Sequence, residues 1–247
     1  MARTEYFAGP TPRLFAHRGL HLNKPDILEN SLDAFRNALE HGATHIESDV
    51  HATKDAVAVL FHDTDLKRTF SRPEKISDLS LSDLAGASSG TIPTLEQALG
   101  EFPETYWNLD LKSWQSVQPA VEVIERLKAH DRVLVSSFSD KRRKAALAAL
   151  SKPVATSAGS ATVLKAILSN YLLGGLGLAR ILRDVDALQI PTSQGFIRLD
   201  SKRFISRIRG LDKEIHFWTV NELAEMQRLL DLGAHGIVTD RADLFPK

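Results

Sequence analysis

The sequence predicts an α/β fold: a (β/α)8 barrel, or TIM barrel, with a small insertion after the second barrel strand. Short runs of β-branched and aliphatic residues alternate with longer helical patterns, as is typical of βα units around a parallel sheet. The length of 247 residues suits one such barrel. The composition, 43 % hydrophobic and 25 % charged, is that of an ordinary globular protein. We therefore expect residues 1–247 to form a single domain.

The expected elements can be read in chain order. The strand segments are Arg13–His17, His45–Val50, Val57–Phe61, Tyr106–Leu111, Val133–Ser137, Val154–Ser157, Ala187–Ile190, Ile215–Thr219 and Gly236–Thr239. The helical segments are Ser31–His41, Thr94–Phe102, Ser116–His130, Asp140–Leu150, Ala161–Leu172, Ser201–Gly210 and Asn221–Leu232. Ser31, Thr94 and Asn221 stand where N-terminal helix caps are expected, and Gly42 and Gly233 stand where helices should end.

These segments include one strand more than an eight-stranded barrel requires. Only the stretch His51 to Ala56 separates the second strand from the third, whereas a parallel crossover needs about a dozen residues or more. We therefore expect Val57–Phe61 to be the return arm of a hairpin. Residues 51–92 then form one excursion, a hairpin plus a small cap, at the C-terminal face where barrel enzymes build their active sites.

Charge and composition exclude several classes of function. Lys plus Arg is 31 and Asp plus Glu is 31, which argues against a nucleic-acid partner. There is no Cys, so the chain has neither a disulfide nor a thiolate metal site. The N-terminal residues lack the apolar segment of a secretory signal, and Lys165 and Asn170 interrupt the longest apolar stretch, Val163–Leu178. We expect a cytoplasmic protein without stable membrane insertion.

Polar side chains gather at the predicted C-terminal ends of the first three barrel strands and of the hairpin arm. They are His17, Arg18, Glu47, Asp49, His62, Asp110 and Lys112. Three carboxylates at one barrel mouth would repel each other unless a cation lay among them. Glu47, Asp49 and Asp110 form an all-oxygen set that suits Mg²⁺ or Ca²⁺. The cationic Arg18 and Lys112 favour a phosphate, and His17 and His62 can serve as an acid–base pair.

Other interpretations of the same residues stay open. Glu47 and Asp49 could form a salt-bridged barrel layer, and Lys112 could simply pair with Asp110. His45 and His51 alternate with these carboxylates, which would allow a mixed transition-metal site, although His45 should lie a layer deeper and His51 should fall in the hairpin turn. Trp218 could belong to the core or form a wall of the substrate pocket.

The motifs together resemble the glycerophosphodiester phosphodiesterase family, within the phosphatidylinositol-phospholipase-C-like barrels. The likeness runs from about residue 13 to the C-terminus and includes FAHRG at 15–19, ENSLDAF at 29–35, IESDVHATKD at 46–55, LFHD at 60–63, IPTLEQAL at 92–99, NLDLK at 108–112, FWTVN at 217–221 and GIVTD at 236–240. Each motif alone is a weak signal, whereas their shared order and spacing are specific.

The resemblance implies an enzyme of phospholipid and glycerol metabolism. It implies that one divalent cation, Mg²⁺ or Ca²⁺ with Mn²⁺ as a further option, binds Glu47, Asp49 and Asp110. It also implies that a substrate hydroxyl attacks phosphorus, that a cyclic phosphate forms and is opened by water, and that sn-glycerol 3-phosphate and an alcohol are released. His17 and His62 would exchange protons in both steps. Arg18 and Lys112 would contact the phosphate, Glu29 would orient Arg18 or the metal ligands, and a helical cap between His62 and Ile92 would shape the pocket.

The chain also departs from the family pattern. Asp110 stands where bacterial members of the family commonly have Glu. An Asp at this position resembles the related phospholipase D toxins, which release cyclic phosphates. A lysophospholipase D or cyclising phospholipase acting through the same site is therefore an alternative, and a non-catalytic barrel that binds a phosphorylated ligand is another. The expected partner is a small glycerophosphodiester, with the alcohol leaving group and the oligomeric state left open.

Overall fold

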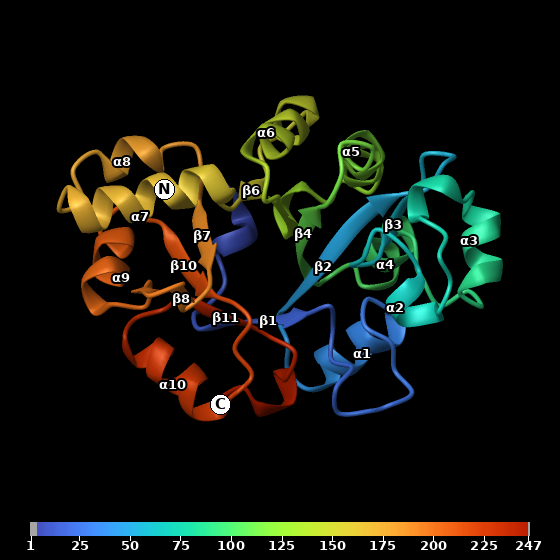
Figure 1. Cartoon of the computed structure of the whole chain (residues 1–247), viewed down its shortest axis with the longest axis horizontal. Coiled ribbons are helices and arrows are strands. Elements are labelled where there is room, and N and C mark those ends of the chain that lie inside the picture. Colours follow the sequence, from blue (N-terminus) through green and yellow to red (C-terminus); the bar gives the residue numbers. More distant parts are fainter. Residues whose placement is uncertain (1–3, 247) are drawn as a thin grey trace.

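A computed structural model describes residues 4–246, and over this range the expected fold class is confirmed. Parallel strands follow one another around a barrel in the order β6-β5-β4-β2-β1-β11-β10-β7 (Figure 1). A bridge between Ser157 and Ala187 joins the two ends of this order. The barrel strands are β1 (Arg13–His17), β2 (His45–Ala52), β4 (Tyr106–Leu111), β5 (Val133–Ser136), β6 (Ala155–Thr156), β7 (Ala187–Ile190), β10 (Glu214–Phe217) and β11 (Gly236–Thr239).

The additional strand forms the hairpin that the short connection predicts. β3 (Ala58–Leu60) pairs with β2 in antiparallel fashion, with Val50 opposite Leu60 and Ala52 opposite Ala58. β2 runs two residues further than expected, so His51 lies within the strand opposite Val59. Its expected position in the turn was wrong, because the ladder continues past Val50.

Helices surround the barrel on its outside (Figure 1). The helices that alternate with the barrel strands are α1 (Leu32–Glu40), α4 (Leu95–Glu101), α5 (Val117–Arg126), α6 (Asp140–Ala149), α7 (Ser160–Leu172), α9 (Lys202–Arg209) and α10 (Leu223–Asp231). Ser31 and Thr94 cap their helices as expected, since each side-chain oxygen accepts a hydrogen bond from the third helical amide. The expected cap at Asn221 was wrong: α10 begins at Leu223, and the Asn221 side chain binds Asp240 instead.

The excursion after β2 contains short helices around a small core of its own. Its elements are α2 (Lys67–Phe70), the 3-10 helix Ile76–Asp78 and α3 (Leu81–Ala87). Val59, Phe61, Leu66, Ile76 and Leu84 are among the buried side chains that pack together there, apart from the larger barrel clusters. Figure 1 shows α2 and α3 beside the barrel, next to β3. We call residues 53–93 the cap.

Further elements did not stand out in the sequence pattern. They are α8 (Leu178–Ile181), the small antiparallel pair β8 (Ser193–Gln194) and β9 (Ile197–Arg198), and the 3-10 helices Glu5–Phe7, His130–Arg132 and Ala242–Leu244. The residues that the structure describes include no helix both long and apolar enough to cross a bilayer.

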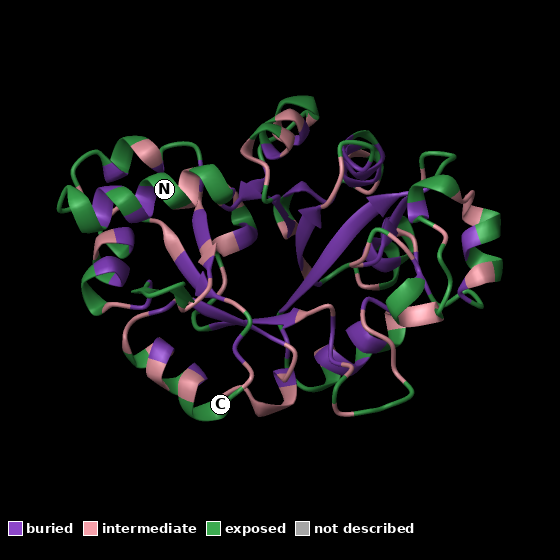
Figure 2. Cartoon of the chain, in the orientation of Figure 1, coloured by how far each residue is buried: buried purple, intermediate pink, exposed green. Residues whose placement is uncertain are grey.

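The barrel strands are buried, whereas the outer faces of the helices are exposed (Figure 2). At the start of β1 and β10, an ion pair joins the two strands: the buried Arg13 donates to the partly exposed Glu214 through Nε and Nη2, at 2.9 and 2.8 Å. Burial alone would raise the pKa of Glu214, but hydrogen bonds from His216 and Arg13 outweigh it and lower the pKa to about 2. This pair lies at the opposite end of the strands from the predicted site.

Candidate active site

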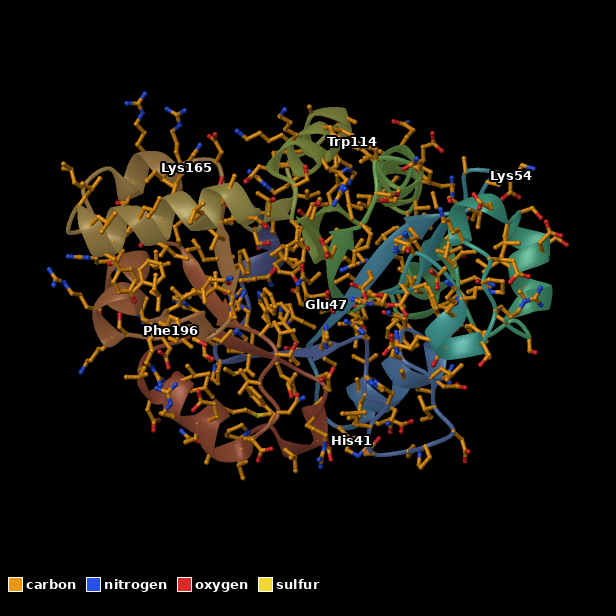
Figure 3. All side chains as sticks on the ribbon, in the orientation of Figure 1. His41, Glu47, Lys54, Trp114, Lys165 and Phe196 are labelled. Carbon is orange, nitrogen blue, oxygen red and sulfur yellow. The ribbon has the colours of Figure 1, made fainter. Side chains whose placement is uncertain are left out.

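A cavity of about 540 Å³ opens at the C-terminal ends of the barrel strands. The predicted site residues that line it are His17, Arg18, Glu47, Asp49, His62, Asp110, Lys112 and Trp218. Glu29 lies behind Arg18 and does not line the cavity. Figure 3 shows Glu47 near the centre of the barrel, far from the labelled surface residues.

Strand register explains why residues from distant motifs meet here. In the parallel pairing of β1 with β2, His17 lies opposite Glu47. In the pairing of β2 with β4, Asp49 lies opposite Asp110. Because side chains alternate along a strand, Glu47 and Asp49 point to the same face. His62 follows β3, so the hairpin returns the chain to the same cavity.

A carboxylate holds each of the two histidines through Nδ1. His17 Nδ1 lies 2.6 Å from Asp240 Oδ1, and Asn221 donates to the other oxygen of Asp240 at 2.9 Å. His62 Nδ1 lies 2.7 Å from Asp63 Oδ1. In the neutral ring, an Nδ1 proton donated to a carboxylate leaves Nε2 as the proton acceptor. Both imidazoles are therefore oriented to exchange protons through Nε2.

The environment of His17 favours its protonated form. Burial would lower the pKa of His17, but the hydrogen bond to Asp240 and the charge of Glu47 outweigh burial and raise it. Glu47 Oε2 lies 3.8 Å from His17 Nε2. The raised pKa means that the His17 ring holds its proton more firmly than a free imidazole does.

The nearby cationic side chains affect the pKa values of the three carboxylates to different degrees. Lys112 Nζ lies 2.6 Å from both Asp49 Oδ1 and Asp110 Oδ2. Although burial acts to raise the pKa of Asp49, the charges of Lys112 and Arg18 lower it overall. Burial and the charge of Asp49 raise the pKa of Glu47 to about 7, and burial also raises the pKa of Asp110.

Two of these carboxylates present oxygens that suit a further cation. Glu47 Oε2 and Asp110 Oδ1 are buried and accept no hydrogen bond within the described part of the chain. Among residues 4–246, no three His, Asp or Glu side chains lie close enough together to hold a metal ion. In the candidate site, the ammonium of Lys112 lies between Asp49 and Asp110. Unpaired buried carboxylate oxygens are costly, and oxygen ligands are those that Mg²⁺ and Ca²⁺ prefer. The all-oxygen chemistry of these side chains suits a hard divalent cation, although the three carboxylates do not converge on one point.

A chain of ion pairs connects the barrel mouth to the cap. Arg18 Nη1 donates to Glu29 at 3.2 Å, and Arg18 Nε lies 3.4 Å from Asp49 Oδ2. On the cap side, Arg68 pairs with Glu29 and donates from Nε to Asp63 at 2.6 Å. Glu29 therefore links Arg18 to the carboxylate that holds His62.

The backbone after His17 fits closely around this network. Arg18 has a φ of 56° and Gly19 a φ of 79°. A Cβ on Gly19 would come within 2.6 Å of the backbone of Ala34 in α1. Glycine is thus required at Gly19 both for its conformation and for the close approach of α1.

Sequence reasoning missed Asp240, Asn221, Asp63 and Arg68 as functional residues. Signals for three of them were present, since Asp240 ends GIVTD, Asn221 ends FWTVN and Asp63 ends LFHD. Each follows a strand at the C-terminal face, where polar residues tend to serve the site. Arg68, in α2, carries no comparable sequence signal.

Aromatic and aliphatic side chains form one wall of the cavity. Trp218 and Phe138 pack edge to face with ring centroids 6.1 Å apart, and Lys112 Nζ lies 5.8 Å from the Phe138 ring centroid. Leu164 of α7 continues this wall and is 56 % exposed. The cavity therefore has a charged floor and an apolar side that opens toward α7.

Comparison with known proteins agrees with this arrangement. A model of the glycerophosphoryl diester phosphodiesterase family matches residues 17–244. The chain belongs to this family. Among curated relatives, a protein of Mycobacterium tuberculosis named probable glycerophosphodiester phosphodiesterase 2 is 40 % identical over 234 residues, which cover 93 % of this chain and 88 % of that protein. The expected family and enzyme class, a glycerophosphodiester phosphodiesterase, are confirmed.

Solved structures of glycerophosphodiester phosphodiesterases share the barrel. The Thermotoga maritima enzyme superposes with a TM-score of 0.74 and 25 % identity, covering 94 % of this chain and 95 % of that one. An Oleispira antarctica phosphodiesterase, solved in complex with sn-glycerol-3-phosphate, gives a TM-score of 0.73 at 24 % identity and covers 94 % of each chain. At that identity the second likeness concerns the fold.

Proposed function

We propose that this phosphodiesterase uses a divalent cation and a histidine pair to hydrolyse glycerophosphodiesters to sn-glycerol 3-phosphate and an alcohol. One observation carries the proposal: His17 and His62, each held at Nδ1 by a carboxylate, line one cavity together with three carboxylates and two cationic side chains. The name of the Mycobacterium tuberculosis relative supports the substrate class.

The histidines would act in two steps. In the first, Nε2 of one histidine takes the proton of a free glycerol hydroxyl as that oxygen bonds to phosphorus. The phosphorus bond to the alcohol breaks, the other histidine protonates the departing oxygen, and a cyclic phosphate remains. In the second, water attacks phosphorus, the ring bond from phosphorus to the glycerol oxygen that attacked first breaks, and sn-glycerol 3-phosphate results. The histidines exchange roles: one takes a proton from the water and the other protonates the released glycerol oxygen, so both return to their starting protonation states.

Cationic side chains would bind the phosphate. Arg18 and Lys112 lie beside the carboxylates at the cavity floor, where they can offset the charge that builds on the phosphoryl oxygens. Glu29 would fix the guanidinium of Arg18 through their ion pair. Trp218, which lines the cavity and packs against Phe138, would form a wall of the substrate pocket.

Glu47, Asp49 and Asp110 would hold the cation, Mg²⁺, Ca²⁺ or Mn²⁺. When bound, such an ion acts as a Lewis acid that stabilises negative charge on phosphoryl oxygens. The unpaired oxygens of Glu47 and Asp110 support this assignment. A divalent ion would compete with Lys112 for Asp49 and Asp110.

Phosphorus NMR on glycerophosphocholine and glycerophosphoglycerol tests the reaction, because it resolves the diester, the cyclic phosphate and glycerol 3-phosphate. We expect glycerol 3-phosphate from the wild type, and no turnover from His17→Ala or His62→Ala with the fold retained by circular dichroism. His41→Ala, at an exposed helix end, is the matched control and should remain active. A fully active His17→Ala protein would refute the mechanism.

Thermal denaturation tests the cation separately. Mg²⁺, Ca²⁺ or Mn²⁺ should raise the melting temperature of a sample stripped with EDTA and restore its turnover. Glu47→Gln should abolish the thermal shift, whereas Glu96→Gln, at an exposed ion pair with Arg126, should keep it. Full turnover in EDTA would overturn the cation requirement.

The same spectra distinguish the alternatives. A cyclic phosphate that accumulates as the final product would identify a cyclising phospholipase, and binding of glycerophosphodiester without turnover would identify a non-catalytic barrel. The proposal includes the cytoplasmic location expected from the sequence, which cell fractionation tests.

A further inference from the structure

One outer face of the barrel carries an unusual concentration of exposed apolar side chains. In α7, the residues Leu164, Leu168, Tyr171 and Leu172 follow helical spacing and are 43–74 % exposed. Leu173 and Leu176, in the loop to α8, are 61 % and 77 % exposed. Apolar residues at this spacing normally face a core, yet the opposite side of α7, around Ala166 and Ile167, is the one that packs inward. Figure 2 shows the outer surface of α7 and α8 as largely exposed.

The hairpin of β8 and β9 extends this face. Phe196, at its tip, is fully exposed, and Ile197 is 45 % exposed. The Tyr171 hydroxyl donates to the Arg198 carbonyl, which ties the hairpin to α7. Lys165 and Phe196 lie on the same side of the molecule in Figure 3, away from Lys54 in the cap. We call Leu168, Tyr171, Leu172, Leu173, Leu176 and Phe196 the apolar ridge.

The apolar ridge is continuous with the active-site cavity. Val163, Leu164 and Ile167 of α7 line the cavity, and Gln194 of β8 lines it as well. Leu164 belongs both to the cavity wall and to the exposed stripe of the helix. An apolar path therefore leads from the charged cavity floor, past Leu164, to the outer surface.

The charge around this face is strongly asymmetric. Residues 141–183 lie between Asp140, the first residue of α6, and Asp184, and contain the rest of α6 with α7 and α8. They include eight Lys or Arg and no Asp or Glu. The rest of the chain has 23 basic and 31 acidic residues, which gives it a formal charge of −8. Lys165 and Arg180 are exposed beside the apolar ridge. Exposed apolar side chains among basic ones suit the surface of an anionic bilayer, where acyl chains and negative headgroups occur together.

We infer that the apolar ridge docks on an anionic lipid surface and delivers an acyl-bearing phosphodiester, a lysophospholipid, along α7 into the cavity. This inference rests on the proposed function, because the same histidine pair and cationic side chains would act on the phosphodiester headgroup. The charged floor would bind the phosphate as it does in a water-soluble diester. The wall at Leu164 and the apolar ridge would hold the acyl chain, which glycerophosphodiesters lack.

Sedimentation with extruded vesicles tests the docking surface on the full chain. We expect the protein to bind phosphatidylcholine vesicles that contain phosphatidylglycerol, and to bind pure phosphatidylcholine weakly. High salt should release it, because the attraction to anionic headgroups is screened. Leu172→Ser/Leu176→Ser should lower the partition coefficient by about tenfold or more, since two apolar side chains no longer enter the interface. The control Leu22→Ser/Leu223→Ser also removes two exposed leucines and should bind like the wild type.

Activity on two substrates distinguishes this inference from the proposed function. Leu172→Ser/Leu176→Ser should hydrolyse glycerophosphocholine at the wild-type rate but lose about tenfold on lysophosphatidylcholine in anionic vesicles. Wild-type turnover of glycerophosphocholine without vesicle binding would overturn the docking surface alone. Vesicle binding without any turnover would overturn the proposed function. The inference would also be refuted if the apolar ridge were buried in a dimer. Sedimentation velocity would then show a dimer for the wild type and a monomer for Leu172→Ser/Leu176→Ser.

Discussion

Asp240 offers the sharpest test of how this site works, because it touches no substrate group in the proposed reaction. Its Oδ1 lies 2.6 Å from His17 Nδ1, and both side chains are less than one-fifth exposed, at 19 % and 18 %, so solvent screens their interaction weakly. Asp240→Asn keeps the size of the side chain but removes the negative charge. Its amide has one acceptor oxygen, whereas the carboxylate offers one oxygen to His17 and the other to Asn221. The variant therefore tests what the carboxylate, by its charge and its second acceptor oxygen, does for the imidazole.

The structure sets the size of the expected effect. A hydrogen bond to a charged group contributes about 1.5–3 kcal/mol, and about 1.4 kcal/mol corresponds to a tenfold change in rate. We therefore expect kcat/KM on glycerophosphocholine to fall by about 10- to 150-fold, because Asp240→Asn removes the charged hydrogen bond between Asp240 and the protonated His17. The pKa of His17 is raised in the enzyme, with Asp240 among the causes that overcome burial. Removing that charge should move the limb of the rate profile that reports His17 to lower pH.

The assay is the pH dependence of kcat/KM, with an NMR titration of the His17 ring as a direct measurement of its pKa. Asp243→Asn is the matched control, because Asp243 follows soon after in the chain, in the 3-10 helix Ala242–Leu244, and pairs with Arg241 instead. It should leave both profiles unchanged. If Asp240→Asn keeps the wild-type rate and an unshifted His17 pKa, then Asp240 does not position or polarise the imidazole.

Two further predictions concern stability. Glu214→Gln should lower the free energy of unfolding by about 3–5 kcal/mol in urea titrations, because the buried guanidinium of Arg13 loses its negatively charged partner. The pKa of Glu214 lies at about 2, below the ordinary 4.5. The stabilisation by its carboxylate is therefore complete above pH 4.5 and is lost as the pH falls toward 2. Because the variant lacks this carboxylate, it should lose less stability on acidification than the wild type. Gly19→Ala should cost more than about 2 kcal/mol because its methyl group would collide with Ala34, whereas Gly42→Ala, also at positive φ but in open space, should cost about 1 kcal/mol; equal costs would contradict the steric argument.

The sequence predicted the barrel well, because strand periodicity and connection length are local properties. The short link after the second strand was enough to identify β3 as a return arm. In the structure, the register between β2 and β4 places Asp49 beside Asp110. Short elements escaped prediction. α8 and the hairpin of β8 and β9 span only a few residues each, so periodicity has too few repeats to indicate them.

The site residues that could be predicted are those whose chemistry is conspicuous at a strand end. Asn221 shows the limit of local reasoning: its position favours a helix cap, yet its side chain bonds to Asp240, which is remote in sequence. The same holds for Lys112, which bridges Asp49 as well as the expected Asp110. Such contacts depend on which strands pair and in what register, and a local stretch of sequence does not reveal this.

The proposed acid–base pair is divided between two hydrophobic cores. His17 lies on a strand of the barrel, whereas His62 follows β3 within the cap, whose buried side chains pack as a separate small cluster. A small cluster melts at less cost than a large one. On heating, the enzyme should therefore lose turnover as the cap loosens, while the barrel still gives the circular dichroism of a folded protein. Exchange of one cap for another could likewise alter substrate choice without disturbing the strands that carry His17 and the carboxylates.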